Sequence, residues 1–142
     1  MASWRVGEGQ IRRRVVLLAA CLLLLAGCGR GGGDLPGVGL DLLIEPSPPR
    51  IGPATVTVTL RDEGGQALGG ARVELEGNMS HAGMVPVLAP AQEIAPGRYR
   101  GELEFTMGGD WFILVRAELP DGRSLERSVD VPGVDVICGE TP

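Results

Sequence analysis

Methionine and histidine side chains are concentrated in two short segments of the chain. Residues 78–86 contain Met79, Met84 and His81, which is the single histidine, and residues 105–111 contain Met107. Thioether sulfur and imidazole nitrogen suit copper(I), and methionine can serve as a ligand in oxidising compartments where thiolates are easily lost. The sequence therefore predicts a copper site, with Cu(I) as the ion, formed by Met79, His81, Met84 and Met107.

The same side chains are also compatible with roles that involve no copper. Zinc is not usually bound by methionine, and calcium or magnesium would need clustered oxygen ligands that this segment lacks. Methionine also commonly fills gaps in protein cores, and a lone histidine is often structural. Two hypotheses follow: a copper-binding module, and a structural or protein-interaction module without metal.

An enzymatic activity is not expected. Ser80 is the neighbour of His81, but adjacent residues of a strand point to opposite faces, which disfavours a nucleophile and base pair. Acidic residues such as Glu74 and Glu102 fall at solvent-facing positions and indicate a solvated surface. The glycines at 31–33 lack the helix and lysine of a phosphate-binding loop.

In the segments that must position these side chains, apolar and polar residues alternate with a period of two. Short strands are predicted at 40–44, 55–60, 71–76, 98–107, 111–119 and 124–131, separated by turns rich in glycine, proline and aspartate. No segment has a helical period. The pattern predicts an all-β fold, an antiparallel β-sandwich of immunoglobulin-like type with about seven strands.

The same alternation predicts where the candidate ligands point. Met79 and His81 share the inward side if their strand stays regular, and Met107 shares it with Phe105. Trp111 is expected to anchor the core, and the apolar run 111–115 to be covered on both faces. Because both ligand segments lie at strand ends beside glycines, we expect the ligands to converge at one open end of the sandwich.

The N-terminal segment is typical of an exported protein. Three consecutive arginines at 12–14 precede the apolar run 15–25, which ends in Leu25-Ala26-Gly27-Cys28. This ending resembles the bacterial lipobox, in which cleavage makes the cysteine the first residue and the cysteine is acylated. The chain is therefore expected to be anchored through lipid on Cys28 to a membrane, facing the periplasm or the cell exterior. An ordinary signal peptide or a single membrane anchor is the alternative.

Removal of the predicted signal peptide, residues 1–27, would leave 115 of the 142 residues. Nine of the 13 basic and 17 of the 18 acidic residues would remain, a formal charge of −8, which argues against nucleic-acid binding. Cys138 would be the remaining thiol, so no intrachain disulfide is expected. The predicted layout is a lipidated cysteine, Gly/Pro-rich tether and possible first strand over 28–53, with 29–39 flexible, a sandwich domain over 54–133 and a tail over 134–142.

The stretch from Thr55 to Val131 resembles the YtkA-like domain, a relative of the FixH family. The likeness is carried by Met79-x-His81-x-x-Met84-x-Pro86, by Pro96-Gly97-x-Tyr99, and by Phe105-x-Met107-x-Gly109-x-Trp111. FixH-type proteins are associated with copper supply to cytochrome oxidase assembly, although a transmembrane helix usually holds them. The resemblance thus implies a small β-sandwich for copper handling, with an envelope protein or a copper-accepting protein as partner.

Overall fold

A computed structural model describes residues 33–81 and 83–135. Seven strands account for most of this range: β1 (Val38–Glu45), β2 (Gly52–Asp62), β3 (Arg72–Met79), β4 (Val87–Ala95), β5 (Arg98–Phe105), β6 (Gly109–Glu118) and β7 (Ser124–Val134). Those residues form no helix, and thus none that could cross a membrane. The predicted all-β class is confirmed.

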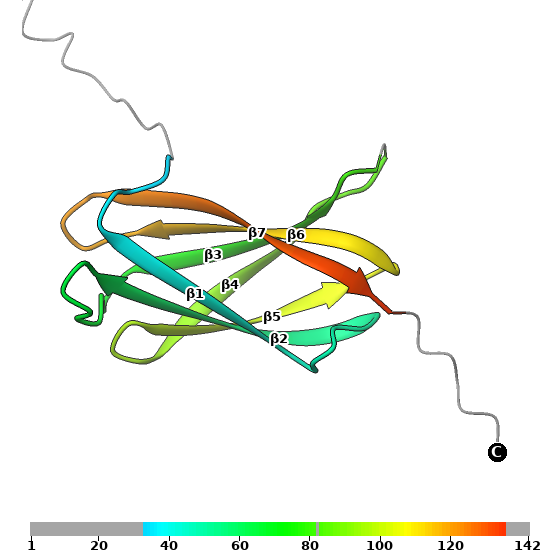
Figure 1. Ribbon diagram of the computed structural model, residues 1–142, viewed down its shortest axis with the longest axis horizontal. Helices are drawn as coiled ribbons and strands as arrows, with labels where there is room; N and C mark the ends of the chain where they lie inside the picture. Colours follow the sequence, from blue (N-terminus) through cyan, green and yellow to red (C-terminus); the bar gives the residue numbers. More distant parts are fainter. Residues whose placement is uncertain (1–32, 82, 136–142) are drawn as a thin grey trace, which may run out of the picture. The chain divides into compact units, whose positions relative to one another are not determined.

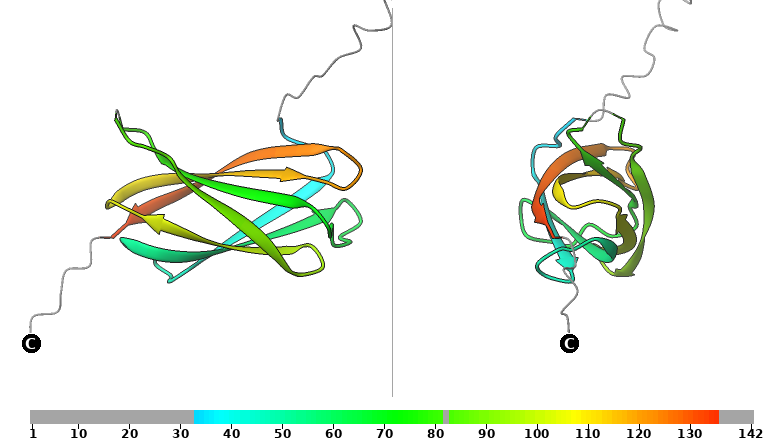
Figure 2. Two further views of the ribbon diagram at one scale, coloured as in Figure 1. Left: turned by 180° about the vertical axis from the view of Figure 1, so that it is seen from behind. Right: turned by 90° about the vertical axis from the view of Figure 1, so that its right-hand side faces the viewer.

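All seven strands belong to one antiparallel sheet in the order β1-β2-β5-β4-β3-β6-β7. The sheet folds over on itself because β4 changes partner: residues 87–91 pair with β3, and residues 92–95 pair with β5. The result is a sandwich of two layers around a shared interior, as Figures 1 and 2 show. Near its other edge, the Asp135 carbonyl accepts a 2.9 Å hydrogen bond from the Ile51 amide, so the layers also meet there.

The interior is filled by the inward residues of the alternating strands. Val56, Leu60, Leu75 and Ile113 are fully buried. Trp111 is also buried and meets the ring of Phe105 edge to face, with centroids 5.1 Å apart and planes at 78°. The predicted role of Trp111 as a core anchor is confirmed.

One strand was not anticipated from the sequence. β4 lacks a clean alternation of apolar and polar residues and contains Pro90, which argues against a strand. At Pro90 the strand pairs with Glu74 of β3, whereas pairing with β5 begins only at Gln92. A proline is tolerated there because the strand has a neighbour on one side only.

The apolar run at the start of β6 is covered on one face only. Trp111, Ile113 and Val115 are buried, but Phe112 and Leu114 are partly exposed on the outer face. The expectation that both faces are covered was therefore wrong. β6 lies between β3 and β7 within one layer, so its inner face meets the core while no described element lies over its outer face.

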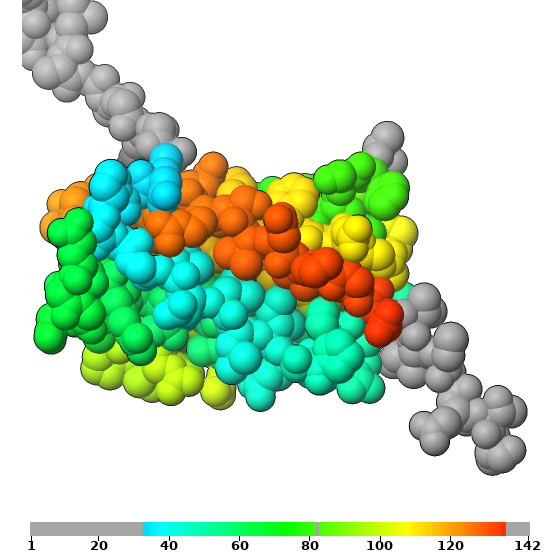
Figure 3. Space-filling view, viewed as in Figure 1, coloured from blue at the N-terminus to red at the C-terminus, as the bar shows by residue number. Residues whose placement is uncertain are grey.

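Residues 33–39 are the described part of the tether predicted at 29–39, and they form specific contacts with the sandwich, while residues 29–32 lie outside the described residues. The carboxylate of Asp34 forms an ion pair with Arg127, and the Gly33 carbonyl accepts a 3.2 Å hydrogen bond from the Glu126 amide. Leu35 packs against the core and β1 begins at Val38. Figure 3 shows this segment lying on the first part of β7. Apolar burial and the ion pair hold the segment in place, and the strand expected at 40–44 is β1.

Candidate metal centre at one end of the sandwich

Both segments that contain the candidate ligands lie at the same end of the sandwich, here called the Met end. It consists of the end of β3, the loop 80–86, the turn 106–108 between β5 and β6, and the end of β7. The strand register joins these parts, since Met79 pairs with Trp111 and Gly109 pairs with Val134. Figures 1 and 2 show the loop and the turn at this end from two opposite sides.

Met79 lies inside the sandwich, as its position in the alternation predicted. It is the last residue of β3 and only 7% exposed. A Cβ placed on Gly109 would lie 3.0 Å from the Met79 methyl carbon, so this side chain extends to the backbone of β6. Gly109 has φ +126°, which other residues rarely adopt. Met79 is thereby brought next to the turn that carries Met107.

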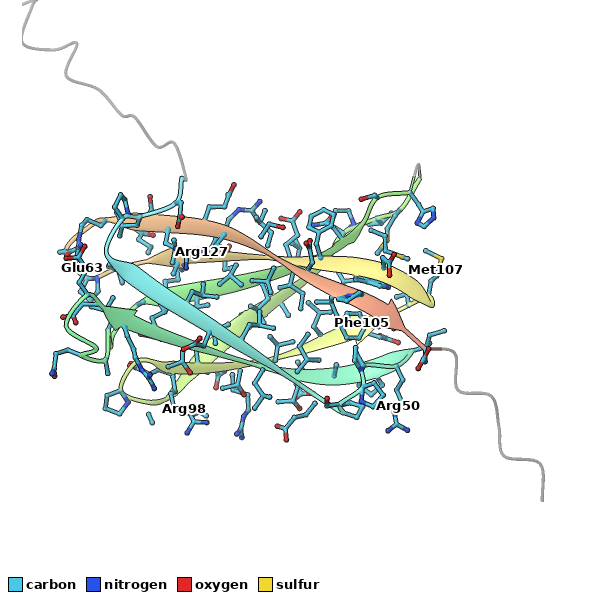
Figure 4. All side chains as sticks on the ribbon, viewed as in Figure 1. Arg50, Glu63, Arg98, Phe105, Met107 and Arg127 are labelled. Atoms are coloured by element: carbon cyan, nitrogen blue, oxygen red, sulfur yellow. The ribbon has the colours of Figure 1, made fainter. Side chains whose placement is uncertain are left out.

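Met107 does not share the inward side with Phe105, contrary to the prediction. β5 ends at Phe105, so the alternation stops before Met107, whose side chain is 46% exposed. Figure 4 shows Met107 at the surface of the Met end. Its backbone is nevertheless held, because the Trp111 indole N–H donates a 2.9 Å hydrogen bond to the Met107 carbonyl oxygen.

His81 and Met84 lie in the loop that follows β3. His81 is exposed, so the inward orientation expected for a regular strand is not found: β3 ends two residues earlier, at Met79. Met84 is partly buried and packs against the core, and its amide lies 3.5 Å from the His81 carbonyl oxygen as hydrogen-bond donor. The Met end thus carries one buried thioether, one partly buried thioether, and an exposed thioether and imidazole.

Within residues 33–81 and 83–135, no three side chains of histidine, cysteine, aspartate or glutamate lie close enough together to hold a metal ion. The candidate donor set at the Met end consists mainly of neutral sulfur. A shallow hollow between β4 and β5, lined by residues such as Gln92 and Arg100, contains none of the candidate ligands. Cys28 and Cys138 lie outside the described residues, as does the predicted signal peptide.

Two residues that shape the Met end were not singled out as functional from the sequence. Gly109 leaves the space that Met79 occupies, and Trp111 fixes the turn of Met107 while packing on Phe105. The sequence feature that could have identified both residues is the segment Met107-Gly108-Gly109-Asp110-Trp111, in which two glycines separate a methionine from a tryptophan.

A polar network covers part of the outer face of β3 and β6. Arg116 forms ion pairs with Glu76 and with Glu126, the latter at 2.9 Å, and the Asn78 side-chain amide donates a 3.0 Å hydrogen bond to Glu76. The hydrogen bonds from Asn78 and Arg116 lower the pKa of Glu76 below its ordinary 4.5. Glu76 is therefore held as a carboxylate on this face.

The fold and the Met end define a small immunoglobulin-like sandwich domain with a methionine-rich end. The family model described as YtkA-like matches residues 41–116. This match spans more than half of the 142 residues and includes all four candidate ligands. The chain belongs to the YtkA-like family. A search of curated proteins gave no match.

Proposed function

We propose that this YtkA-like protein is an exported, lipid-anchored module that binds copper, as Cu(I), at the Met end. The observation that carries the proposal is the proximity of two sequence segments rich in soft ligands: the Met79 methyl group lies against Gly109, two residues from Met107. His81 and Met84 belong to the loop that continues from Met79. Neutral thioethers bind Cu(I) without losing a proton, so binding by them needs no change in their charge.

The different burial of the four side chains suggests separate roles in the proposed site. Met79 is enclosed by the core, where it would provide a fixed ligand. Met107 and His81 are exposed and would complete the coordination from the surface, where a bound ion could also be passed to another protein.

A direct test is titration of the domain from residue 34 onward with Cu(I) under anaerobic conditions against a competing chelator. The Cys138→Ser background removes thiolate binding from the measurement. This domain contains one tryptophan, Trp111, whose indole is hydrogen-bonded to the Met107 carbonyl, so its fluorescence is a local reporter. We expect one ion per chain and a change in that fluorescence.

The variant Met79→Leu with Met107→Leu should reduce the Cu(I) affinity at least about 100-fold, because it removes two thioethers while keeping similar volume. Val85→Ala, in the same loop, is the matched control and should leave affinity unchanged. Absence of stoichiometric binding, or equal binding by the double variant, would contradict the copper site.

Membrane attachment is proposed to depend on Cys28. Growth with a clickable fatty acid should label the full chain, and Cys28→Ala should lose both the label and the membrane fraction. Cys21→Ala is the matched control, since Cys21 would leave with the signal peptide. A labelled Cys28→Ala variant would contradict acylation at this residue.

The proposed cellular role is copper handling, including supply to cytochrome oxidase assembly. Deletion of the protein should then lower oxidase activity at low copper, and added copper should restore it. Wild-type protein should complement the deletion, but Met79→Leu with Met107→Leu should not. Full complementation by this variant would favour the second candidate, an interaction module, which the partly exposed Phe112 and Leu114 of β6 and the exposed Leu88 of β4 support independently of copper.

A further inference from the structure

The outer face of β4, β3 and β6 near the Met end carries apolar side chains, of which one is exposed and two are partly exposed. Leu88 of β4 and Leu114 of β6 flank Glu76 of β3 in one cross-strand row, and Phe112 lies beside Asn78 in the next. Even-numbered positions of β3 and β6 alternate with the buried ones, so these side chains share the outer face. Leu88 is 72% exposed and is the most exposed member of what we call the outer patch: Leu88, Phe112 and Leu114.

The outer patch is unusual for a surface that only meets water. Phe112 and Leu114 belong to a continuous apolar run, and such runs are typical of strands that are covered on both faces. Here the core covers the inner face alone. Apolar surface patches that are rimmed by polar residues mark interaction sites. The composition of β6 thus fits a strand whose outer face is buried part of the time by another molecule.

The border of the outer patch is acidic. Six carboxylates and two guanidinium groups lie on this face, a net charge of −4: Glu74, Glu76, Asp110, Glu118, Glu126, Asp130, Arg72 and Arg116. Asp130 pairs directly with Phe112, and Glu76 pairs with Leu88 and Leu114. The carboxylates therefore surround the apolar side chains closely.

From this combination we infer that the outer patch docks a protein whose own surface presents apolar side chains ringed by arginine or lysine. A second copy of the chain fits poorly, because two faces of charge −4 would oppose each other. An anionic membrane surface is repelled for the same reason. The same charges attract a cationic partner, which raises its rate of association and orients it on the patch.

This inference goes beyond the proposed copper site and does not require a metal. The two features are nonetheless adjacent, because Asn78 of the second row directly precedes Met79. A partner docked on the outer patch would lie beside the Met end, where it could receive an ion from exposed ligands.

The test uses the full-length chain in cells that naturally produce it. A photo-crosslinking amino acid replaces Leu88 in one strain and Leu43 in another. Leu43 is the matched control, since it is a 54% exposed leucine on β1. We expect an adduct with a different protein from position 88 and not from position 43. The captured protein is then purified, and its affinity for the variants Leu88→Arg, Leu43→Arg and Asp130→Lys is measured.

Leu88→Arg should weaken binding at least about tenfold, Asp130→Lys should weaken it less, and Leu43→Arg should change it less than about twofold. Added salt should weaken binding of the unmodified chain, because the carboxylates steer the partner. No adduct at position 88, an adduct of twice the chain's own mass, equal adducts at both positions, or an unaffected Leu88→Arg variant would each overturn the inference.

Copper titration of the same variants separates this inference from the copper proposal. Leu88→Arg should bind Cu(I) as the unmodified chain does, and Met79→Leu with Met107→Leu should still form the adduct from position 88. Circular dichroism and thermal unfolding should be unchanged in Leu88→Arg, because this side chain is largely in solvent. If Leu88→Arg no longer binds the captured protein, the loss is then due to the changed surface and not to a change in the fold.

Discussion

The two ends of the sandwich are held together by different kinds of contact. At the end opposite the Met end, here called the Tyr99 end, the Tyr99 hydroxyl donates a 2.7 Å hydrogen bond to the Leu68 carbonyl and accepts one of 3.0 Å from the Ala71 amide. The Glu93 carboxylate accepts 3.1 Å hydrogen bonds from Gly70 and Gly97. These groups tie the loop between β2 and β3 to the turn between β4 and β5.

At the Met end, sulfur and aromatic contacts replace most of this polar network. Among the described residues, the side-chain hydrogen bonds of the turn 106–108 and of the end of β7 are the one from Trp111 to Met107 and one of 2.9 Å from the Gly133 amide to Asp110. Met79 packs without any polar contact of its own. The comparison teaches that side-chain hydrogen bonds join the loops of the Tyr99 end, whereas the His81 and Met107 side chains at the Met end are exposed.

Residues 33–38 add further contacts at the Tyr99 end of the sandwich. Asp34 forms an ion pair with Arg127 in the first part of β7, Leu35 packs against the core, and Val38 pairs with Asp62 at the end of β2. These contacts lie at the Tyr99 end, where Figure 4 also shows Arg127 and Glu63. The described chain therefore enters the sandwich at the Tyr99 end.

Replacing Trp111 should have the largest effect on stability, because this side chain packs in the core beneath the turn of Met107. Trp111→Ala removes a buried indole and its contact with Phe105, so we expect the free energy of unfolding to fall by about 3–5 kcal/mol. Urea unfolding monitored by circular dichroism measures it. Phe112→Ala, the next residue on the outer face, should cost less than half as much. Equal losses would mean that both faces of β6 support the fold.

Much of the fold follows from the alternation of apolar and polar residues, because a strand with one face in the core must place every second side chain inward. The strands around Val58, Leu75 and Ile113 could be predicted for this reason. β4 could not, because Pro90 obscures its pattern and its change of partner depends on contacts between distant residues. The docking of Gly33 and Asp34 also depends on β7, which the local glycine content does not reveal.

The candidate site could be predicted in composition but only partly in geometry. Alternation predicts a direction only as long as a strand continues, and β3 and β5 end at Met79 and Phe105. Met79 was therefore placed correctly, whereas His81 and Met107 were not. The contact of Met79 with Gly109 joins two strands and follows from their register, which no local pattern contains.

Tyr99→Phe tests the Tyr99 end. It leaves the Leu68 carbonyl and the Ala71 amide without their partner, so unfolding free energy should fall by about 1–3 kcal/mol while Cu(I) affinity stays unchanged. Met107→Leu should do the reverse: lower Cu(I) affinity with little change in stability. If Tyr99→Phe weakened copper binding as strongly as Met107→Leu, the two ends would not be independent.

The stability of Tyr99→Phe should also differ from that of the unmodified chain at alkaline pH. Burial raises the pKa of Tyr99 above its ordinary 10.0, so the folded state resists deprotonation and loses stability as the pH rises above 10.0. Tyr99→Phe should lack this loss. Tyr99 is the single tyrosine in the chain, so phenolate absorbance during a pH titration follows this group alone.

Gly109→Ala should have a moderate effect at the Met end. The added methyl group would lie 3.0 Å from the Met79 methyl carbon and would displace that side chain, so we expect Cu(I) affinity to fall about tenfold. Gly52→Ala is the matched control, because Gly52 has a similar φ of +116° but nothing within 4 Å of its added Cβ. Both variants should lose about 1 kcal/mol of stability from backbone strain. Equal copper affinities would place the metal away from Met79.

Glu76→Gln should have the smallest effect, and its dependence on pH is the informative part. Because the folded-state pKa of Glu76 lies below the ordinary 4.5, the carboxylate stabilises the fold at pH values above 4.5 and loses this contribution as the pH falls further. Near neutral pH the variant should lose about 1 kcal/mol, since Arg116 is partly exposed and solvent weakens the pair. That difference should disappear in acid. Glu74→Gln, at an exposed position of the same face, is the control and should change the free energy of unfolding little at any pH. If the loss of stability in Glu76→Gln persisted in acid, packing of the Glu76 side chain and not its charge would stabilise this face.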